Sequence, residues 1–434
     1  MFTFQPFDDS IYRQKIKDLA DKFIDLAELS NAEASEVIRL EEIDILLDMQ
    51  LHTLGHRLHI TAAQPAPVQM NYLVYPGTSG ASFLQYLVTD RVVTPAQHAA
   101  HYSEAFLMLP STYQISFYDR YVNKYATTTA TTAAGGAAPP TVTSRHADRV
   151  LVLCNFNKID KFDSDSFTIW TQVMSRFPAS VFRFVIDTRK EVVHNIHTEF
   201  ALRGVHPNRV AFLPRVSKEE HIRRHQDMDL FVDSLVYGAH STATDALRGG
   251  LPVLTLEGET FPQRVGASLL ESLSEEEGGR GMDHGKRDQR AYQQQKQGEK
   301  QEGGRQSEES LALLSKLLCT FSKKSFEDVA VKLLQSPVML QKLRNLLLQA
   351  SGGGGGGGGP VPEGVVTDAS IGRSRTGFFH TENRVRDFLR GMQAAAEVEQ
   401  LQLQMKFQWW GEGSSSNHDE HMDSKRAHII VTNQ

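Results

Sequence analysis

The residues best suited to chemistry lie in one short stretch, residues 238–254. After its leading glycine, which we expect to let the backbone turn tightly, His240, Ser241 and Thr242 offer side-chain donors. We expect a helix to begin here, where its amides and dipole favour an anion. Asp245 would lie about one turn into that helix, suited to accept hydrogen bonds from ribose hydroxyls. The pattern predicts a nucleotide-binding loop, and the alternative is an ordinary helix cap beside an α/β sheet.

The elements that must hold this loop follow the pattern of a doubly wound sheet. Gly249, Gly250 and Pro252 would end the helix, and residues 253–256 would resume as a strand. Upstream, apolar runs alternate with polar helical segments, as is typical of βαβ units. These runs cover residues 149–155, 181–186, 210–213 and 230–232.

The first part of the chain has a second α/β pattern. Residues 12–27 carry apolar side chains at helical spacing, and three segments have the composition of short strands: 43–47, 70–75 and 86–89. No Gly-x-Gly-x-x-Gly follows an early strand, so the pattern does not favour a dinucleotide-dependent oxidoreductase. Two α/β halves with the phosphate-binding helix in the second half predict two Rossmann-like domains of the GT-B glycosyltransferase type, with disordered insertions.

Composition narrows the class of protein further. The 434 residues are 40% hydrophobic and 23% charged, and the formal net charge of -6 gives no basic field for nucleic acid. Only Cys154 and Cys319 are present, each in an apolar run, which favours a reducing compartment over a disulfide framework. The start of the sequence does not resemble a signal peptide, and no apolar run approaches the length of a membrane span. We expect a soluble protein of the cytoplasm or nucleus.

Biased segments suggest the division of the chain. An Ala/Thr-rich linker, a Glu/Gln/Gly/Arg-rich insertion and a glycine-rich linker lack the periodicity of a packed core. The expected boundaries are 1–125 for an incomplete acceptor-side half, 126–147 for the first linker, 148–350 for the nucleotide-binding half with its disordered insertion at 271–310, 351–370 for the glycine-rich linker, 371–398 for a C-terminal helix and 399–434 for a tail.

Several motifs, in matching order, resemble the catalytic region of the O-GlcNAc transferases. In the first half they are residues 64–69, 75–80, 86–90, 94–95 and 101–104. In the second half they are residues 154–157 with Lys161, 218–224, 240–242 with Asp245, and 258–260 with Arg264. The resemblance covers roughly residues 10–118, 148–272 and, more weakly, 320–395.

The resemblance implies transfer of N-acetylglucosamine from UDP-GlcNAc to serine or threonine hydroxyls of intracellular proteins. It implies inversion at the anomeric carbon, no metal or other cofactor, and neither nucleic acid nor membrane as a partner. The leaving UDP develops negative charge, which without a metal requires a fixed ammonium and helix-end amides. Lys161 stands at the family's diphosphate position as the catalytic residue, and Ser241 and Thr242 match its phosphate-contacting pair.

The resemblance also assigns the rest of the UDP-sugar pocket. His240 would stack on or flank the uracil, and Asp245 would bind the ribose. Lys218 and His221 are three residues apart, can share a helix face, and would line the nucleoside side. A glycine-bearing turn would lie near the sugar and diphosphate, and it consists of Gly77, Thr78 and Ser79.

The chain departs from the family pattern at several points. A histidine-bearing segment that would precede Phe2 and the tetratricopeptide repeats that present acceptors are missing, so we expect this chain to bind UDP but to transfer sugar poorly. The family's Asp and His in Asp-Gly-Ile-His are Glu41 and Asp44 here, and its Gln and Tyr before the lysine are Lys158 and Asp160. Three alternatives stay open: a GDP-fucose-dependent protein O-fucosyltransferase of the SPINDLY type, a degenerate nucleotide-sugar-binding scaffold, and a partial gene model without activity.

Overall fold

The computed structural model describes residues 1–4, 8–116, 150–187, 189–273, 311–351, 381–412 and 429–430. The linker predicted at 126–147, all but the first residue of the linker predicted at 351–370, and all but the first three residues of the insertion predicted at 271–310 lie outside these ranges.

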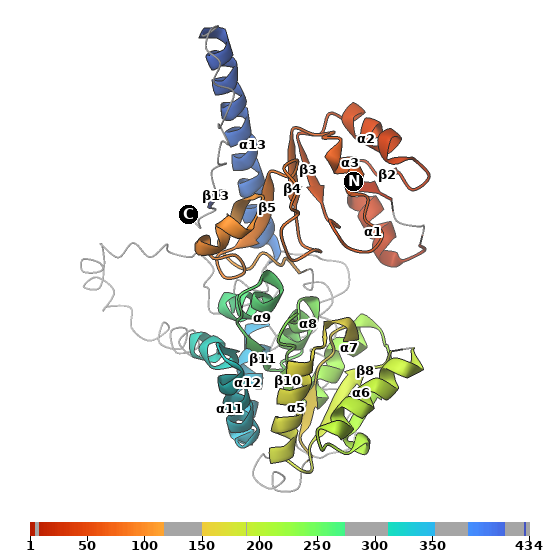
Figure 1. Cartoon of the computed structure of the whole chain (residues 1–434), viewed down its shortest axis with the longest axis vertical. Helices are drawn as coiled ribbons and strands as arrows, with labels where there is room; N and C mark the ends of the chain where they lie inside the picture. The colour runs from red at the N-terminus through yellow and green to blue at the C-terminus, as the bar shows by residue number, and fades with distance from the viewer. Residues whose placement is uncertain are drawn as a thin grey trace, which may run out of the picture. The chain divides into compact units, whose positions relative to one another are not determined.

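The chain divides into two compact units. Unit 1 comprises Met1–Tyr113 and, near the C-terminus, the chain from Arg386, whereas unit 2 comprises Gln114–Val385. In Figure 1 unit 1 runs from red to orange with a blue helix, and unit 2 runs from yellow to light blue. Most of the C-terminal helix therefore belongs with unit 1 and not with unit 2, which precedes it in the chain.

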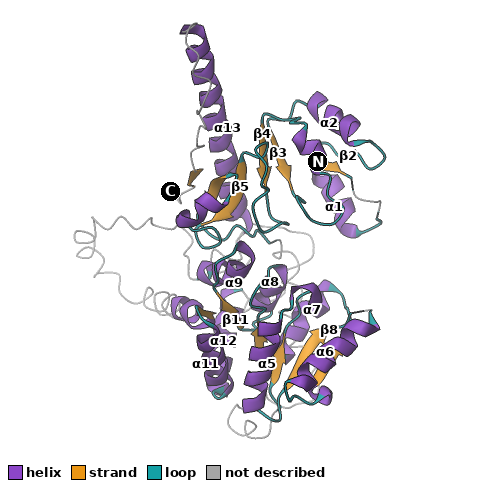
Figure 2. Ribbon diagram, viewed as in Figure 1, coloured by secondary structure: helices purple, strands orange, loops and turns teal. Residues whose placement is uncertain are grey.

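Unit 1 contains a parallel five-stranded sheet in the order β13-β6-β5-β4-β3 (Figure 2). Its strands are β3 (Ile45–Asp48), β4 (Val68–Asn71), β5 (Tyr86–Asp90), β6 (Ala105–Leu109) and β13 (Ile429–Ile430). The strand expected at 70–75 lies earlier and ends at Asn71. Just beyond it Leu73 has a left-handed φ of 77°, which takes the chain out of the extended conformation.

Unit 1 also contains short helices and a small parallel sheet. The sheet pairs β1 (Phe2–Thr3) with β2 (Ile24–Asp25), and the helices are α1 (Ile11–Leu19), α2 (Asn31–Leu40), α3 (Leu58–Ala62) and the 3-10 helix η1 (Ala96–His101). The helix expected over residues 12–27 ends at Leu19, and none of its residues is buried. Leu26 instead packs in a core cluster with Ala34, Ile38 and Ile60, which explains why the chain leaves the helix before reaching it.

Unit 2 contains the doubly wound sheet that the apolar runs predicted. Its six strands are all parallel and lie in the order β12-β11-β10-β7-β8-β9. They are β7 (Val152–Cys154), β8 (Val181–Val185), β9 (Val210–Leu213), β10 (Leu230–Val232), β11 (Val253–Leu256) and β12 (Cys319–Thr320). If β7 is numbered 1, this is the 3-2-1-4-5-6 strand order of a Rossmann fold. The side of the sheet to which successive strands are added changes between β7 and β10.

Helices connect these strands. They are α5 (Ser164–Arg176), α6 (Lys190–Leu202), α7 (Lys218–Arg224), α8 (Ser241–Arg248), α9 (Phe261–Ser272), α11 (Lys323–Leu334) and α12 (Pro337–Ala350), with 3-10 turns η3 (Ile159–Lys161), η4 (Pro207–Arg209) and η5 (His225–Asp227). The helix end predicted at Gly249 is confirmed: Gly249 caps α8, and Gly250 follows with a φ of 76°.

An aromatic core fixes the first half of unit 2. Trp170 of α5 packs on Phe182 at 5.2 Å between ring centroids, and Phe182 stacks on Phe184 at 4.6 Å. The Trp170 indole also donates to the backbone oxygen of Asp233 at 3.2 Å. The core is thus tied directly to the loop that follows β10.

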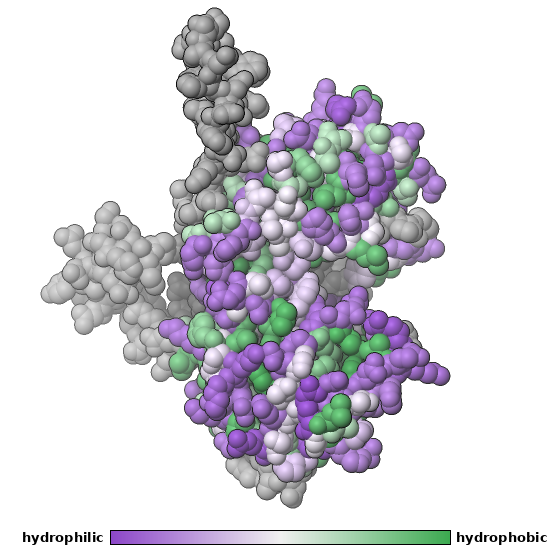
Figure 3. Space-filling view, in the orientation of Figure 1, coloured by the Kyte–Doolittle hydropathy of each residue, from purple (hydrophilic) through white to green (hydrophobic). Residues whose placement is uncertain are grey.

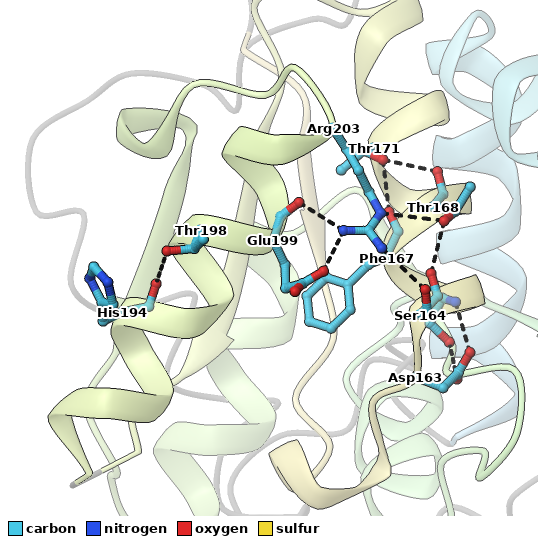
Figure 4. A network of polar contacts seen from close by, with 10 residues as sticks. Asp163, Ser164, Phe167, Thr168, Thr171, His194, Thr198, Glu199 and Arg203 are labelled. Carbon is cyan, nitrogen blue, oxygen red and sulfur yellow. Dashed lines mark hydrogen bonds and ion pairs between the residues drawn. The ribbon is translucent and has the colours of Figure 1, made fainter.

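Polar contacts lock α5 against α6 (Figure 4). The Arg203 guanidinium, at the end of α6, donates to Ser164 Oγ at 3.2 Å and Thr168 Oγ1 at 3.3 Å, both on α5, and pairs with Glu199 of its own helix. Asp163 caps α5 by accepting from the Ser166 amide at 3.0 Å. Since α5 begins directly after η3, these contacts also hold the segment that carries Lys161.

The last helix, α13 (Thr381–Glu412), extends further than the sequence predicts for 371–398. The Phe388 ring lies 4.9 Å from the Tyr72 ring of unit 1, whereas Leu389 is exposed. None of the helices in the described ranges is long and apolar enough to span a membrane. Figure 3 shows hydrophobic side chains in separate patches among hydrophilic ones on the face in view.

Candidate functional site

The strand order of unit 2 indicates where a ligand would bind. In an open parallel sheet, ligands bind beyond the carboxyl ends of the strands where the order reverses, which here is the edge formed by β7 and β10. The loop after β7 carries Asn155, Asn157 and Lys161, and the loop after β10 leads from Asp233 to α8. The predicted loop and the predicted lysine therefore follow neighbouring strands.

Asp233 organises this edge, and sequence reasoning missed it. Its fully buried carboxylate accepts from the amides of Ser234 and Ala239 at 2.8 Å, from Asn157 Nδ2 at 3.2 Å and from Thr255 Oγ1 at 2.9 Å. Burial raises the pKa of Asp233 to about 6, while these hydrogen bonds act in the opposite direction. The available signal was an aspartate directly after a buried strand, where the carboxyl ends of parallel strands gather.

Gly238 serves a different purpose from the one expected. Among the glycines that the structure describes, Gly55, Gly80, Gly204 and Gly250 have a positive φ and Gly238 does not. The turn at Gly238 therefore does not require a left-handed backbone conformation. A Cβ at Gly238 would instead lie 3.1 Å from Asp233 Oδ2 and 3.1 Å from the Pro262 oxygen. The close packing of the loop against this buried carboxylate and the Pro262 carbonyl therefore favours glycine.

The start of α8 presents backbone amides without a side-chain cap. His240 is the N-cap residue, and its side chain makes no capping hydrogen bond. Its backbone oxygen accepts from the amides of Ala243 and Thr244, so Ser241 and Thr242 supply the first amides of the helix, which have no partner within it. Thr242 Oγ1 donates to Asn157 Oδ1 at 2.5 Å. This terminus has the composition of an anion site.

The predicted lysine lies beside this terminus. Lys161 Nζ donates to the Gly238 oxygen at 2.9 Å and lies 4.1 Å from the centroid of the Tyr237 ring. Burial lowers the pKa of Lys161 to about 8, and the charge of Asp233 opposes that shift. Burial and the Lys161 charge also lower the pKa of His240 well below its ordinary value, so its imidazole is neutral at pH 7. The site holds one partly desolvated ammonium next to the helix start.

The predicted nucleoside-side residues also come together. Lys218 Nζ contacts Asp245 Oδ1 and Oδ2 at 2.6 Å, and His221 Nε2 lies 3.8 Å from Asp245 Oδ2. Burial, followed by the charges of Arg224 and Lys218, lowers the pKa of His221 to about 4, so its contact with Asp245 is not an ion pair at pH 7. The prediction that Lys218 and His221 share a face of α7 is confirmed, because both reach the same carboxylate of α8.

Gly77, Thr78 and Ser79 belong to unit 1, where they form a cluster of their own. Buried Glu104 accepts from the Ser79 amide at 2.6 Å and from Thr78 Oγ1 at 2.7 Å, and the Gly77 oxygen accepts from Asn71 Nδ2 at 3.0 Å. Ser103 Oγ donates to the same carboxylate at 3.0 Å. The buried carboxylate of Glu104 therefore accepts from two successive residues of the turn, and Asn71 donates to the third.

His52 also reaches this turn, and sequence reasoning missed it. Its Nε2 lies 2.9 Å from the Ser79 oxygen, and because that oxygen only accepts, Nε2 must carry the proton. The ring packs edge-on against Tyr75 at 5.1 Å. The preceding Leu51 is fully buried with a φ of 46°, a conformation that branched residues avoid. No local pattern marks His52, since a 27-residue separation divides the two bonded groups.

Three of the four substituted positions that depart from the family pattern, Glu41, Lys158 and Asp160, take part in ion pairs. Lys158 Nζ contacts Asp160 Oδ2 at 2.7 Å, and Arg189 Nη2 lies 3.4 Å from Asp160 Oδ1. In unit 1, Lys22 Nζ pairs with Glu41 at 2.5 Å. Ion pairs that are this accessible to solvent contribute little to stability.

The fold and this arrangement define a glycosyltransferase of the GT-B type, with two Rossmann-like halves. The chain matches Glycosyl transferase family 41 over residues 1–136 and 120–278. It belongs to that family.

Individual relatives extend this finding. The chain is 32% identical over 262 residues to an Arabidopsis thaliana protein called "Probable UDP-N-acetylglucosamine--peptide N-acetylglucosaminyltransferase SEC", covering 60% of this chain and 26% of that protein. It is 25% identical to the UDP-N-acetylglucosamine--peptide N-acetylglucosaminyltransferase of Caenorhabditis elegans, covering 61% and 32%. A solved structure of a mutant O-GlcNAc transferase from Thermobaculum terrenum superposes with a TM-score of 0.65 at 22% identity, covering 91% of this chain and 61% of that one.

Proposed function

We propose that this protein transfers N-acetylglucosamine from UDP-GlcNAc to serine or threonine hydroxyls of cytoplasmic or nuclear proteins, with inversion and without a metal. The observation that carries the proposal is the Lys161 ammonium held 2.9 Å from the Gly238 oxygen, next to the uncapped start of α8. Family membership supports the reaction class, and the names of the relatives support the donor.

The chemistry of the leaving group explains this arrangement. As the bond from the anomeric carbon to UDP breaks, negative charge grows on the diphosphate. The first amides of α8, at Ser241 and Thr242, can donate to one phosphate, and Lys161 can donate to the other. Both are fixed before the reaction begins, so they stabilise the transition state without reorganising.

The second half of the pocket would bind the nucleoside. Asp245 is buried and already held by Lys218, so its oxygens are fixed for the ribose hydroxyls. His240, neutral at pH 7, offers an uncharged ring to the uracil. Neutrality matters because a charged imidazole would need solvation that a stacked base cannot provide.

Calorimetric titration of the full chain with UDP and with GDP, in EDTA, tests the proposal. We expect UDP to bind without added metal and more tightly than GDP. Lys218→Met should weaken UDP binding because Asp245 loses the ammonium that holds its carboxylate in place, whereas Lys332→Met, on the exposed face of α11, should not. Tighter binding of GDP would assign the chain to the fucosyl-transferring alternative, and binding of neither nucleotide would contradict the proposal and favour a scaffold that has lost the nucleotide site.

A further inference from the structure

One aromatic ring lies close to both Lys161 and His240, the N-cap residue of α8. Tyr237, half-buried in the loop after β10, places its ring centroid 4.1 Å from Lys161 Nζ. The same ring lies 5.2 Å from the His240 ring, tilted by 44°. The sequence-based assignment of the pocket did not include Tyr237, although it directly precedes Gly238.

The ammonium of Lys161 is hydrogen-bonded to a carbonyl oxygen and not to a carboxylate. Among the described residues its ammonium donates to one acceptor, the Gly238 carbonyl, and it has three N–H groups. Asp233 influences its charge but bonds to other groups, among them Thr255 and the Ala239 amide. A carboxylate bonded to Lys161 would compete with a diphosphate for the ammonium. A carbonyl oxygen and an aromatic face hold the ammonium without neutralising it.

The ring also bears on whether Lys161 is charged. Burial alone favours the neutral amine, and Asp233 is the charged group that opposes it. His240 faces the lysine as a neutral ring, so it does not compete for the proton. The negative face of an aromatic ring attracts an ammonium most strongly where water is excluded, so Tyr237 favours the charged form at the position where a phosphate would need it.

We propose that Tyr237 is a positioning residue, whose ring holds the Lys161 ammonium beside the start of α8 for the leaving diphosphate. This inference rests on the proposed function, in which Lys161 binds the diphosphate. It predicts that the aromatic face matters and that the phenolic hydroxyl does not.

Paired substitutions in the full chain separate the ring from the hydroxyl and from the filled volume. Tyr237→Phe keeps the ring, and Tyr237→Leu keeps an apolar side chain without a π face. Tyr12→Leu, in α1 of unit 1, is the matched control for removing a partly exposed tyrosine. Each chain is titrated with UDP in EDTA at several pH values from about 6.5 to about 9.5.

We expect UDP affinity in the parent chain to fall as pH rises through about 8, because Lys161 then loses its proton. Tyr237→Phe should keep this profile within about twofold, whereas Tyr237→Leu should bind UDP about tenfold more weakly near neutral pH and lose affinity at a lower pH. Tyr12→Leu should follow the parent chain.

The results of these titrations separate a failure of the role proposed for Tyr237 from a failure of the proposed function. If the parent chain binds no UDP, the proposed function fails and the inference fails with it. If the parent binds UDP and Tyr237→Leu has the affinity and pH profile of Tyr237→Phe, the inference alone is overturned. Should Tyr237→Leu unfold, a series of fluorinated phenylalanines at position 237 replaces it. Affinity that falls with each added fluorine supports the ring's role, because fluorine weakens the negative face, and constant affinity overturns it.

Discussion

In each unit, a buried carboxylate organises a loop by accepting several hydrogen bonds. In unit 2 the buried Asp233 carboxylate gathers two loop amides and the side chains of Asn157 and Thr255. In unit 1 the buried Glu104 carboxylate accepts hydrogen bonds from the amide of Ser79 and from the hydroxyls of Thr78 and Ser103. Each acid follows or precedes a buried strand and shapes a loop at the edge of a parallel sheet.

The two loops differ in the polar groups beside them that could bind a ligand. Beside the Asp233 loop are the Lys161 ammonium and the amides that begin α8. The Glu104 loop has no lysine or arginine bonded to it among the residues that the structure describes, and its hydroxyls already donate to the acid. Unit 2 is therefore suited to an anion, whereas the unit 1 turn offers backbone groups and the imidazole of His52, which suit neutral hydroxyl-bearing ligands.

Removing the Lys161 ammonium should have the largest effect. Lys161→Met keeps the unbranched stem but not the charge, and we expect the rate of UDP release from UDP-GlcNAc to fall by about 10²- to 10³-fold, by analogy with the loss of one preorganised donor. UDP affinity should fall less, because the charge that Lys161 meets grows during bond breaking. Single-turnover assays measure the first quantity and calorimetry the second.

Lys158→Met is the matched control, since Lys158 lies three residues away in an exposed pair with Asp160. Its turnover should stay near that of the parent chain. Equal losses in the two variants would show that net charge near the loop, and not the position of Lys161, decides the rate.

Asp233→Ala should destabilise unit 2 by about 3 kcal/mol, because the buried amides of Ser234 and Ala239 lose the carboxylate that accepts their hydrogen bonds. It should also abolish UDP binding, since the loop that carries Gly238 loses its anchor. Asp229→Ala is the counterpart at the other end of β10, where Asp229 accepts from the Val152 amide at 2.8 Å. Urea unfolding and calorimetry should show instability in both variants but loss of UDP binding only in Asp233→Ala.

Glu104→Ala tests the unit 1 side of the comparison. We expect a loss of about 2 kcal/mol in stability, because the buried Ser79 amide loses its acceptor while the hydroxyls can find water. UDP binding, which we assign to unit 2, should be unchanged, and turnover of UDP-GlcNAc should fall. Weakened UDP binding in this variant would contradict the assignment of the nucleotide to unit 2 alone.

The smallest expected effect is a pH dependence of stability. His225 is fully buried, neither of its ring nitrogens has a hydrogen-bond partner among the described residues, and burial lowers its pKa well below the ordinary value. The unfolded chain therefore takes up a proton that the folded chain refuses, so stability falls as pH drops below about 6.5. The raised pKa of Asp233, about 6, works in the opposite direction below that pH and offsets part of the loss.

His225→Leu removes one such group. Between about pH 7.5 and about pH 5.5, the variant should lose about 1 kcal/mol less stability than the parent chain. His194→Leu, on the exposed face of α6, should leave the pH dependence unchanged. Identical stability changes for the parent chain and His225→Leu between the two pH values, measured by urea unfolding, would show that His225 takes up its proton equally in the folded and unfolded states, so that burial does not lower its pKa.

Much of unit 2 was predictable from the sequence because its signals are local. The apolar runs gave β7, β8, β9 and β10, and the glycines after Arg248 gave the end of α8. Lys218 and His221 share a helix face by their spacing alone. The lysine at 161 needed the resemblance to a family, since nothing in its own neighbourhood distinguishes it from a surface lysine.

Tertiary structure alone decided the rest. Asp233, Tyr237 and His52 act through partners that lie far along the chain, such as Lys161, which lies 76 residues before Tyr237, and no periodicity encodes such contacts. Gly238 was marked by its type, but the reason for it, the nearby Asp233 carboxylate, required the fold. The sequence by itself determined which segments become strands and helices, because backbone and burial preferences repeat along neighbouring residues. Packing determined which side chains form the site, because a buried charge must find its partners wherever the fold places them.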